Sequence, residues 1–364
     1  MPEQKFITID IGSAWTKVFL VSIDTKNTLN LDKSLRLPTA THDPALSANL
    51  LLEELGKVDA PKIFVSSLKH AQEVAKSYNA ELVKEEDITR ALLDFFKIPS
   101  LDLVIFDGGA TGLSSLASSE VPATGEKLEI KEIGKFLPFL IGDINLENFL
   151  GNRMHFPHII PKNSKELDIE EAIIRNLLSP KISGKQSKKD KFLLLTGGLL
   201  SDTPSINRIA SLVADCLDAP EVVRVLLDRK FFLPSFGALL TAYKQLKVAV
   251  PGPWLEILGT FVSLGAPLPV KLDWGYSQEQ QIELSANEIV AIPAGQNQKI
   301  DLEITLGKEK KSSQIFGGSL GILFDAREKP LVLTFGQDSS IKKVANWKQT
   351  FDKMSSSYGD ILSH

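Results

Sequence analysis

A short polar stretch near the start of the chain, DIGSAWTK at residues 10–17, combines one carboxylate, one glycine and several donors. The runs on either side, Phe6–Ile11 and Val18–Val21, are rich in β-branched and aromatic residues. Such runs are typical of β-strands, and the short distance between them predicts a hairpin. The polar residues would then lie at its tip.

The residue types at this tip suit the binding of an anion together with a cation. Gly12 lets the backbone approach a ligand closely, and the amide groups of such a turn can point at an anion. Asp10 would face a cation bridged to that anion. The side-chain donors are Ser13, Thr16 and Lys17. We therefore expect a phosphate group with Mg²⁺ here, and a hairpin without a ligand is the alternative.

A second glycine-rich stretch, DGGATGLSS, begins at Asp107. It follows the short apolar run 101–106, which we interpret as a buried strand because Pro99 blocks a helix. Gly108 and Gly109 would allow close approach to a phosphate, and the Thr111 hydroxyl could donate to it. An ordinary glycine-rich turn is the alternative.

A third glycine pair follows another predicted strand. Phe192–Leu195 leads into TGGLLSDTPS, and a helix is expected over Ile206–Leu217. The order of strand, double glycine and helix brings bare backbone to the end of a buried strand.

Length and composition describe an ordinary globular protein with roughly two domains in 364 residues. The net charge of −4 argues against general nucleic-acid binding. The single cysteine, Cys216, excludes an internal disulfide framework and a multi-cysteine metal site. No apolar run reaches about 18 residues, so no membrane insertion is expected. The start, MPEQK, leads directly into a strand, and we expect a cytoplasmic protein without a signal peptide.

Strands and helices alternate up to residue 248, and a composition shift follows at AVPGPW, residues 249–254. Beyond it the sequence predicts short strands with turns between them, as in a small β-sandwich or barrel. The expected organisation is α/β, with a nucleotide-binding domain over 1–248, a β-domain over 254–340, and a helix with a tail over 341–364.

The three loops, taken in this order, resemble those of the actin-like ATPases. The resemblance implies a duplicated, ribonuclease H-like fold that binds ATP and Mg²⁺, followed here by a small all-β part. It implies that Asp10 coordinates the metal through water, that the first two loops bind the phosphates, and that adenosine lies against Gly197, Gly198 and Leu199.

Longer segments resemble the GlmL/MutL family, which is associated with coenzyme-B12-dependent glutamate mutase. These are NFLGNRMHFPHIIPKNSKELDIEEAIIRNLL, LLLTGGLLSDTP, VVRVLLDRKFFLPSFGALL and IFGGSLGILFDAREKPLVL. The resemblance covers residues 5–21, 101–117, 143–247 and, more loosely, 255–350. It implies an ATP-dependent, chaperone-like partner of the mutase.

Two departures from the family affect this expectation. The region between the first two loops, 22–100, is much shorter than in the family. In the second loop Phe106 takes the place of the family's acidic residue, Asp107 is its neighbour, and Gly112 and Leu113 replace Thr-Asp. A carboxylate near this position, with Asp10, would serve the metal or the attacking water, so we expect weak or absent ATPase activity.

Two other functions fit the same loops. A non-catalytic assembly or scaffold protein, of the FtsA or pilus-assembly type, would keep the fold without the chemistry. A small-molecule kinase would need a carboxylate base near Asp107 or Asp143.

Overall fold

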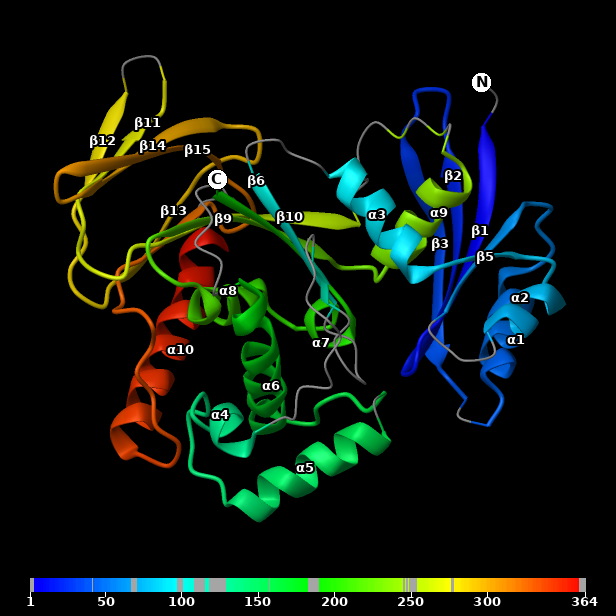
Figure 1. The fold of residues 1–364 in the computed structure, drawn as a ribbon, viewed down its shortest axis with the longest axis horizontal. Helices are drawn as coiled ribbons and strands as arrows, with labels where there is room; N and C mark the ends of the chain where they lie inside the picture. Colours follow the sequence, from blue (N-terminus) through cyan, green and yellow to red (C-terminus); the bar gives the residue numbers. More distant parts are fainter. Residues whose placement is uncertain are drawn as a thin grey trace.

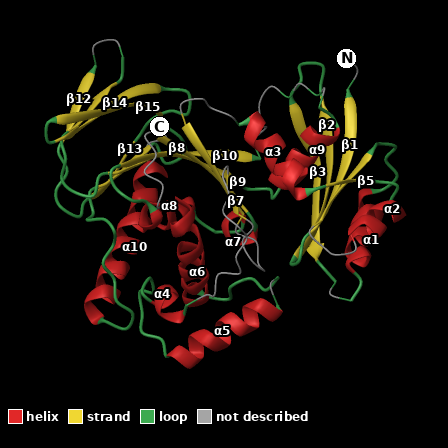
Figure 2. Ribbon diagram, in the orientation of Figure 1, coloured by secondary structure: helices red, strands yellow, loops and turns green. Residues whose placement is uncertain are grey.

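The computed structural model describes residues 3–40, 42–66, 71–96, 101–107, 115–117, 129–156, 158–182, 190–244, 246, 248, 254–275 and 278–359. Its strands form three sheets (Figure 1). Helices pack against the first two sheets, which belong to two lobes (Figure 2). None of the helices in these ranges is long and apolar enough to cross a membrane.

The first lobe contains a five-stranded sheet in the order β3-β2-β1-β4-β5. Its strands are β1 (Gln4–Ile11), β2 (Trp15–Ile23), β3 (Leu29–Pro38), β4 (Lys62–Ser66) and β5 (Glu81–Val83). Helices α1 (Pro44–Leu55) and α2 (Ala71–Ser77) pack on one face, against residues such as Ile9 and Val18. The Asp43 side chain accepts from the backbone N–H of Ala45 and caps the start of α1.

The second lobe is built on a seven-stranded sheet in the order β13-β16-β10-β9-β8-β6-β7. Its strands are β6 (Leu101–Asp107), β7 (Ser115–Ala117), β8 (Asp190–Thr196), β9 (Glu221–Asp228), β10 (Leu255–Ser263), β13 (Ile289–Ile292) and β16 (Ile322–Asp325). The helices of this lobe are α4 (Ile130–Gly134), α5 (Asp143–His155), α6 (Ser164–Ile182), α7 (Gly198–Ser201) and α8 (Ile206–Cys216). Leu193 and Leu195 of β8 pack in one core with α6 and α8.

The two sheets repeat one arrangement of strands. β1 pairs antiparallel with β2 and parallel with β4, and β4 pairs parallel with β5. In the same way, β6 pairs antiparallel with β7 and parallel with β8, and β8 pairs parallel with β9. This duplication is the fold of the actin-like ATPases, which confirms the predicted fold class.

Helices α3 (Glu85–Phe95) and α9 (Leu233–Ala242) lie between the two sheets (Figure 1). They pack closely because Gly237 has no side chain: a Cβ there would lie 2.7 Å from Cγ2 of Ile88 and 2.8 Å from Cγ of Leu92. The core around them takes residues from both sheets, including Phe19 and Phe192. The two lobes therefore share one hydrophobic core beside the cleft.

The C-terminal third contributes to two sheets. A separate four-stranded sheet has the order β12-β11-β14-β15. Its strands are β11 (Val270–Asp273), β12 (Glu279–Ile282), β14 (Lys299–Leu306) and β15 (Glu309–Phe316). By contrast, β10, β13 and β16 extend the seven-stranded sheet of the second lobe. This sheet therefore crosses the expected boundary at 248–254, and the division into domains stays a prediction.

The last helix, α10 (Asp338–Gly359), packs against α8 and is held by buried charges. The Lys348 ammonium donates to Asp168 on α6 at 2.6 Å and 2.9 Å. Arg327, fully buried, lies 4.7 Å from the Trp347 ring and pairs with Asp215 and Asp325 at 2.7 Å and 2.8 Å. The salt bridge between Asp325 and Arg327 is thus buried.

Candidate functional site

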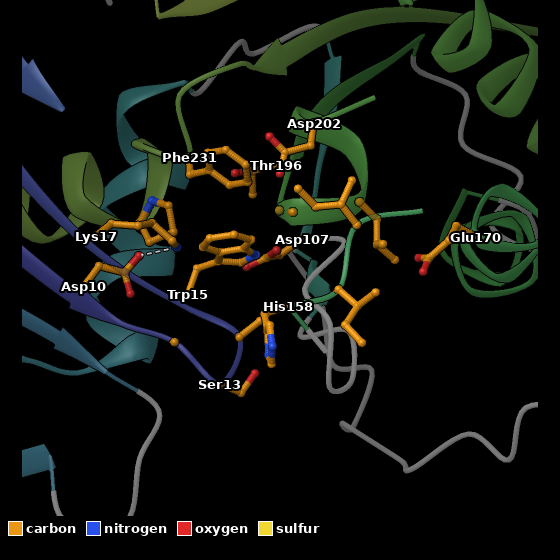
Figure 3. A pocket seen from close by; sticks show the side chains of 18 of the residues that line it. Asp10, Ser13, Trp15, Lys17, Asp107, His158, Glu170, Thr196, Asp202 and Phe231 are labelled. Atoms are coloured by element: carbon orange, nitrogen blue, oxygen red, sulfur yellow. Dashed lines mark hydrogen bonds and ion pairs between the residues drawn. The ribbon is translucent and has the colours of Figure 1, made fainter. Parts of the chain in front are cut away.

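A cavity of about 460 Å³ lies between the two lobes and is lined by residues of both. Its walls come from the β1–β2 turn, the end of β6, the turn between β8 and α7, and the segment that follows α5. Figure 3 shows the side chains around it. The turns that the sequence singles out therefore meet at one site, as far as the structure describes them.

The β1–β2 hairpin brings a carboxylate and an ammonium group together. Asp10 and Lys17 are paired in the register of the two strands, and Lys17 Nζ donates to Asp10 Oδ2 at 2.8 Å. Both side chains are largely buried, at 7% and 14% exposure. Burial lowers the pKa of Lys17, but the carboxylates of Asp10, Asp107 and Asp228 together raise it above its usual value. Lys17 is therefore a buried cation in a negatively charged site.

Asp107 is the last residue of β6 and lines the same cavity. Side chains alternate along a strand, so Phe106 packs into the core beside α6 while Asp107 lies on the face toward the first lobe. Its Oδ1 is buried and has no hydrogen-bond partner among the described residues. Burial raises the pKa of Asp107 to about 6, Lys17 opposes this, and Asp10 and Asp228 add to it.

The turn after β8 contributes backbone rather than charge. Gly197 has a φ of 98°, in the left-handed region that favours glycine, and the short helix α7 begins at Gly198. Behind the turn, Asp228 accepts from the Thr196 hydroxyl at 2.9 Å and from the backbone N–H of Leu233 at 2.7 Å. Asp228 is thus committed to the fold, although burial raises its pKa as well.

Most of the sequence-predicted residues lie on this cavity. The lining includes Asp10, Gly12, Ser13, Lys17, Asp107, Gly197, Gly198 and Leu199. Gly108, Gly109 and Thr111 lie outside the described residues.

Thr16 is the exception among the described residues, because it does not line the cavity. Strand β2 begins at Trp15 rather than at Val18, so Thr16 is inside the strand and faces away from the cavity. Its hydroxyl, which is buried, lies 3.0 Å from that of Thr39, and Thr39 donates to the carbonyl of Gly12 at 2.8 Å. Thr16 therefore holds the hairpin in place from behind.

Sequence reasoning missed several cavity residues. Trp15 and Phe231 both line it, and the Arg36 guanidinium lies 4.9 Å and 4.8 Å from their ring centroids. Glu170 on α6 also lines it and pairs with Arg153 at 2.8 Å. One of its oxygens, Oε2, is buried and has no hydrogen-bond partner in the described part of the chain. Burial raises the pKa of Glu170 to about 7 despite Arg153.

Glu170 could have been found from the sequence. It precedes Ile173, Ile174 and Leu177 by three, four and seven residues, which puts a carboxylate on the apolar face of the helix. No such signal marks Trp15, Arg36 and Phe231, because they meet only in the folded chain.

The donor set suits a magnesium ion that arrives with phosphates. Mg²⁺ is usually held by one or two carboxylates, substrate phosphates and water. Asp10 and Asp107 supply two carboxylates on one cavity, and the Oδ1 atom of Asp107 is unused. Among the described residues there is no group of three or more His, Cys, Asp or Glu that could hold a metal without such a ligand.

Comparison with known proteins gives distant structural likenesses. No protein-family model matches the chain, and no curated protein matches it. The activator of the 2-hydroxyisocaproyl-CoA dehydratase from Clostridium difficile, solved with bound ADPNP, is 13% identical with a TM-score of 0.39, over 67% of this chain and 96% of that chain. Component A of the (R)-2-hydroxyglutaryl-CoA dehydratase of Acidaminococcus fermentans is 16% identical with a TM-score of 0.38, over 67% and 99%.

A ROK family glucokinase from Streptomyces griseus, in complex with glucose and AMPPNP, is 13% identical with a TM-score of 0.40, over 64% of this chain and 97% of that chain. At this distance such neighbours carry no argument about what the present chain binds.

Proposed function

We propose that this chain binds ATP with Mg²⁺ in the interlobe cavity and acts as a nucleotide-dependent regulatory or chaperone-like protein. The supporting observation is the meeting of Asp10, Lys17 and Asp107 with the Gly197–Gly198 turn on one cavity of about 460 Å³. That volume is in the range of sites for small molecules and cofactors.

The phosphates belong at the end of the cavity near Lys17. Its buried ammonium, the Ser13 hydroxyl and the backbone at Gly12 line that end. Asp10 and Asp107 would hold Mg²⁺, which supplies charge neutralisation for the phosphate oxygens when it is bound. Without the metal, ATP would bring more negative charge to these carboxylates, so binding should depend on Mg²⁺. Gly108, Gly109 and Thr111 are proposed to close the phosphate site from the second lobe.

The adenosine belongs against Gly197, Gly198 and Leu199, where backbone lines the cavity. Glu170 lies beyond this turn, and its carboxylate points toward the cavity in Figure 3. Its unpartnered Oε2 could accept from a ribose hydroxyl. The two ends of the cavity thus offer different chemistry. One end has a lysine and two carboxylates for phosphates with Mg²⁺, and the other has an acceptor for hydroxyls.

Turnover is proposed to be weak or absent. Asp107 could accept a proton from an attacking water near Lys17, whereas Asp10 is paired with Lys17 and Asp228 is hydrogen-bonded to Thr196 and Leu233. With a pKa of about 6 it would be mostly ionised at neutral pH. The Thr-Asp of the GlmL/MutL loop, which is replaced here by Gly112 and Leu113, has no counterpart to assist it.

We propose that nucleotide binding changes how this chain binds a protein partner. Leu140 and Ile144, at 73% and 71% exposure, lie just before and within α5, and Phe156 follows this helix at 52%. Ile159 and Ile160, three and four residues after Phe156, line the cavity, so a surface that could contact a protein adjoins the nucleotide site. From the family resemblance, the partner proposed is a coenzyme-B12-dependent mutase in a cytoplasmic setting, and an assembly complex of the FtsA or pilus type is the alternative.

Isothermal titration tests the nucleotide proposal directly. ATP with Mg²⁺ should bind at a single site, and binding should weaken by at least tenfold when the metal is chelated. GTP is the comparison for base preference, and a phosphate-release assay measures turnover. Absence of heat and of any shift in melting temperature with ATP and Mg²⁺ would reject the proposal.

The partner is tested with purified proteins. Size-exclusion chromatography with a B12-dependent mutase, with and without ATP and Mg²⁺, should give a nucleotide-dependent complex. If the complex with the mutase forms equally well with and without nucleotide, or if no complex forms, the result argues for the assembly alternative.

A further inference from the structure

One set of contacts at the cavity joins the two lobes through side chains alone. It consists of Arg36, Asp202, Trp15 and Phe231, which we call the interlobe latch. Arg36 Nη1 lies 2.9 Å and 3.0 Å from the two carboxylate oxygens of Asp202, to which it donates. Its guanidinium also lies 4.9 Å from the Trp15 ring centroid and 4.8 Å from that of Phe231.

The Arg36–Asp202 ion pair and the Arg36–Phe231 contact run between the lobes. Arg36 belongs to β3 and Trp15 begins β2, so both are fixed to the first lobe. Asp202 follows α7 and Phe231 follows β9, at the ends of second-lobe elements. Separation of the lobes at this edge of the cleft would therefore break the ion pair and remove Phe231 from Arg36.

Phe231 connects the latch to the proposed phosphate site. Its ring lies 5.8 Å from Lys17 Nζ, so it contacts both Arg36 and the cation that pairs with Asp10. Its φ of 57° is a left-handed conformation that a bulky residue rarely adopts. The residue is nonetheless buried, and its surroundings hold the ring in this position.

The latch also covers the proposed adenosine position. A Cβ built on Gly198 would lie 3.9 Å from Cδ1 and Nε1 of Trp15 and 3.9 Å from Cε1 of Phe231. The two rings thus stand in van der Waals range of the bare backbone at the adenosine position. Side-chain exposure of 37% for Arg36 and 28% for Asp202 places the ion pair at the rim of the cleft.

We propose that the interlobe latch regulates the nucleotide site by holding the lobes closed, so that its opening limits how fast nucleotide enters and leaves. This inference rests on the proposed function. A partly exposed ion pair together with the one cation–π contact that crosses the cleft, Arg36 with Phe231, should favour the closed arrangement by about tenfold, which a ligand can overcome.

Stopped-flow mixing with a fluorescent ATP analogue and Mg²⁺ measures the gating. Arg36→Gln should raise the rates of nucleotide entry and of nucleotide release by about tenfold each, with little change in Kd. The variant lowers the stability of the closed arrangement both with and without nucleotide, so the lobes open more often in both states. Arg90→Gln is the control, since Arg90 pairs with Asp87 on the exposed surface of α3 at 3.4 Å. Unchanged rates in Arg36→Gln would overturn the latch. Partial restoration by the exchanged pair Arg36→Asp with Asp202→Arg would identify the ion pair as its basis.

A second readout needs no nucleotide. Spin labels on Glu54→Cys in α1 and Lys165→Cys in α6 report the distance between the lobes. The native Cys216 is buried, and burial raises its pKa to about 12, so it should not be labelled. Arg36→Gln should shift this distance distribution toward longer separations.

The two measurements separate the latch from the nucleotide proposal. If the distance shifts and no ATP binds, the latch stands and the proposed function fails. If ATP binds while neither distance nor rates change, the function stands and the latch is wrong. If no ATP binds and the distance does not move, both are wrong.

Discussion

Two hairpins begin the repeated halves of this fold, and their carboxylates have different surroundings. In the first lobe, Asp10 lies opposite Lys17 in the register of β1 and β2 and forms an ion pair at 2.8 Å. In the second lobe, Asp107 ends β6, and the last paired position before it, Phe106, lies opposite Ser115. The corresponding hairpins thus provide one paired carboxylate and one with an unused oxygen.

The difference shows how the two halves of a duplicated fold can have different chemical roles. A cation placed across a hairpin keeps its carboxylate ionised and fixed. A carboxylate buried without such a neighbour gains a proton more easily, as the raised pKa of Asp107 indicates. The first lobe therefore offers a fixed charge pair, and the second offers a group that can exchange a proton or accept a metal.

Removing the cation of the first hairpin should have the largest effect on the free energy of unfolding. Lys17→Met leaves Asp10 buried and unpaired, which typically costs about 3–5 kcal/mol. Urea unfolding at neutral pH measures the loss. Lys310→Met is the matched control, because Lys310 pairs with Glu303 on the surface and should change stability by less than about 1 kcal/mol.

The double variant Asp10→Asn with Lys17→Met sharpens this comparison. It removes both charges, so it should recover much of the stability lost in Lys17→Met. ATP binding should be absent in both variants, because both lack the Lys17 ammonium of the proposed phosphate site. Equal stability of Lys17→Met and the wild type would mean that the ion pair does not hold the hairpin.

Neutralising the carboxylate of the second hairpin should raise the free energy of unfolding, whereas Lys17→Met should lower it. The pKa of Asp107 is raised from 3.8 to about 6, so the folded state binds its proton more tightly than the unfolded state. Stability from this group is therefore present at low pH and lost as pH rises through about 6. Asp107→Asn should stabilise the protein at pH 7 by up to about 3 kcal/mol.

The pH dependence of that gain is its check. It should shrink as pH falls from about 6 toward 4, where the wild-type carboxyl takes up its own proton. Thermal unfolding across this range measures it, with Asp94→Asn, at an exposed position on α3, as the control. A gain that does not vary with pH would assign the effect to packing instead of charge.

Local patterns of apolar residues and glycine predict strands such as β1, β2, β6 and β8 and the glycine turns. The duplicated fold is implied by the resemblance to the actin-like ATPases. The sequence does not predict which sheet a strand joins. The strands β10, β13 and β16 read like the rest of a β-domain, but they complete the second-lobe sheet through distant pairings. The Arg36–Asp202 pair joins residues separated by 166 positions and has no local signal.

Thr16 illustrates a smaller limit, that of strand boundaries. The polar residues within SAWTK, at 13–17, suggest one long turn. In the structure the turn ends at Ala14, and the alternation of strand β2 begins at Trp15. Because side chains alternate along a strand, neighbouring residues lie on opposite faces once the strand includes them. Lys17 therefore lies on the cavity and Thr16 behind it.

Thr16→Val tests that assignment with a moderate effect. It removes the hydroxyl contact with Thr39, which should cost about 1 kcal/mol of unfolding free energy. ATP affinity should stay within about twofold, because the methyl groups remain outside the cavity. A tenfold loss of ATP affinity at unchanged stability would mean that Thr16 contacts the phosphates after all.

Gly198→Ala should have the smallest effect on stability and a clear effect on binding. The new Cβ would meet Trp15 and Phe231 at 3.9 Å, an ordinary contact, and alanine suits the first residue of α7. We expect a change in unfolding free energy within about 0.5 kcal/mol. The same methyl group would occupy the space proposed for adenosine, so ATP affinity should fall by about tenfold, or about 1.4 kcal/mol.

Gly151→Ala provides the matched control, since a Cβ at Gly151 would meet no described atom within 4 Å and Gly151 does not line the cavity. It should leave titrations with ATP and Mg²⁺ unchanged. If Gly198→Ala binds ATP as well as the wild type does, the second-lobe turn does not contact adenosine. The nucleotide would then be held mainly by the charges around Lys17, and the first hairpin alone would account for binding.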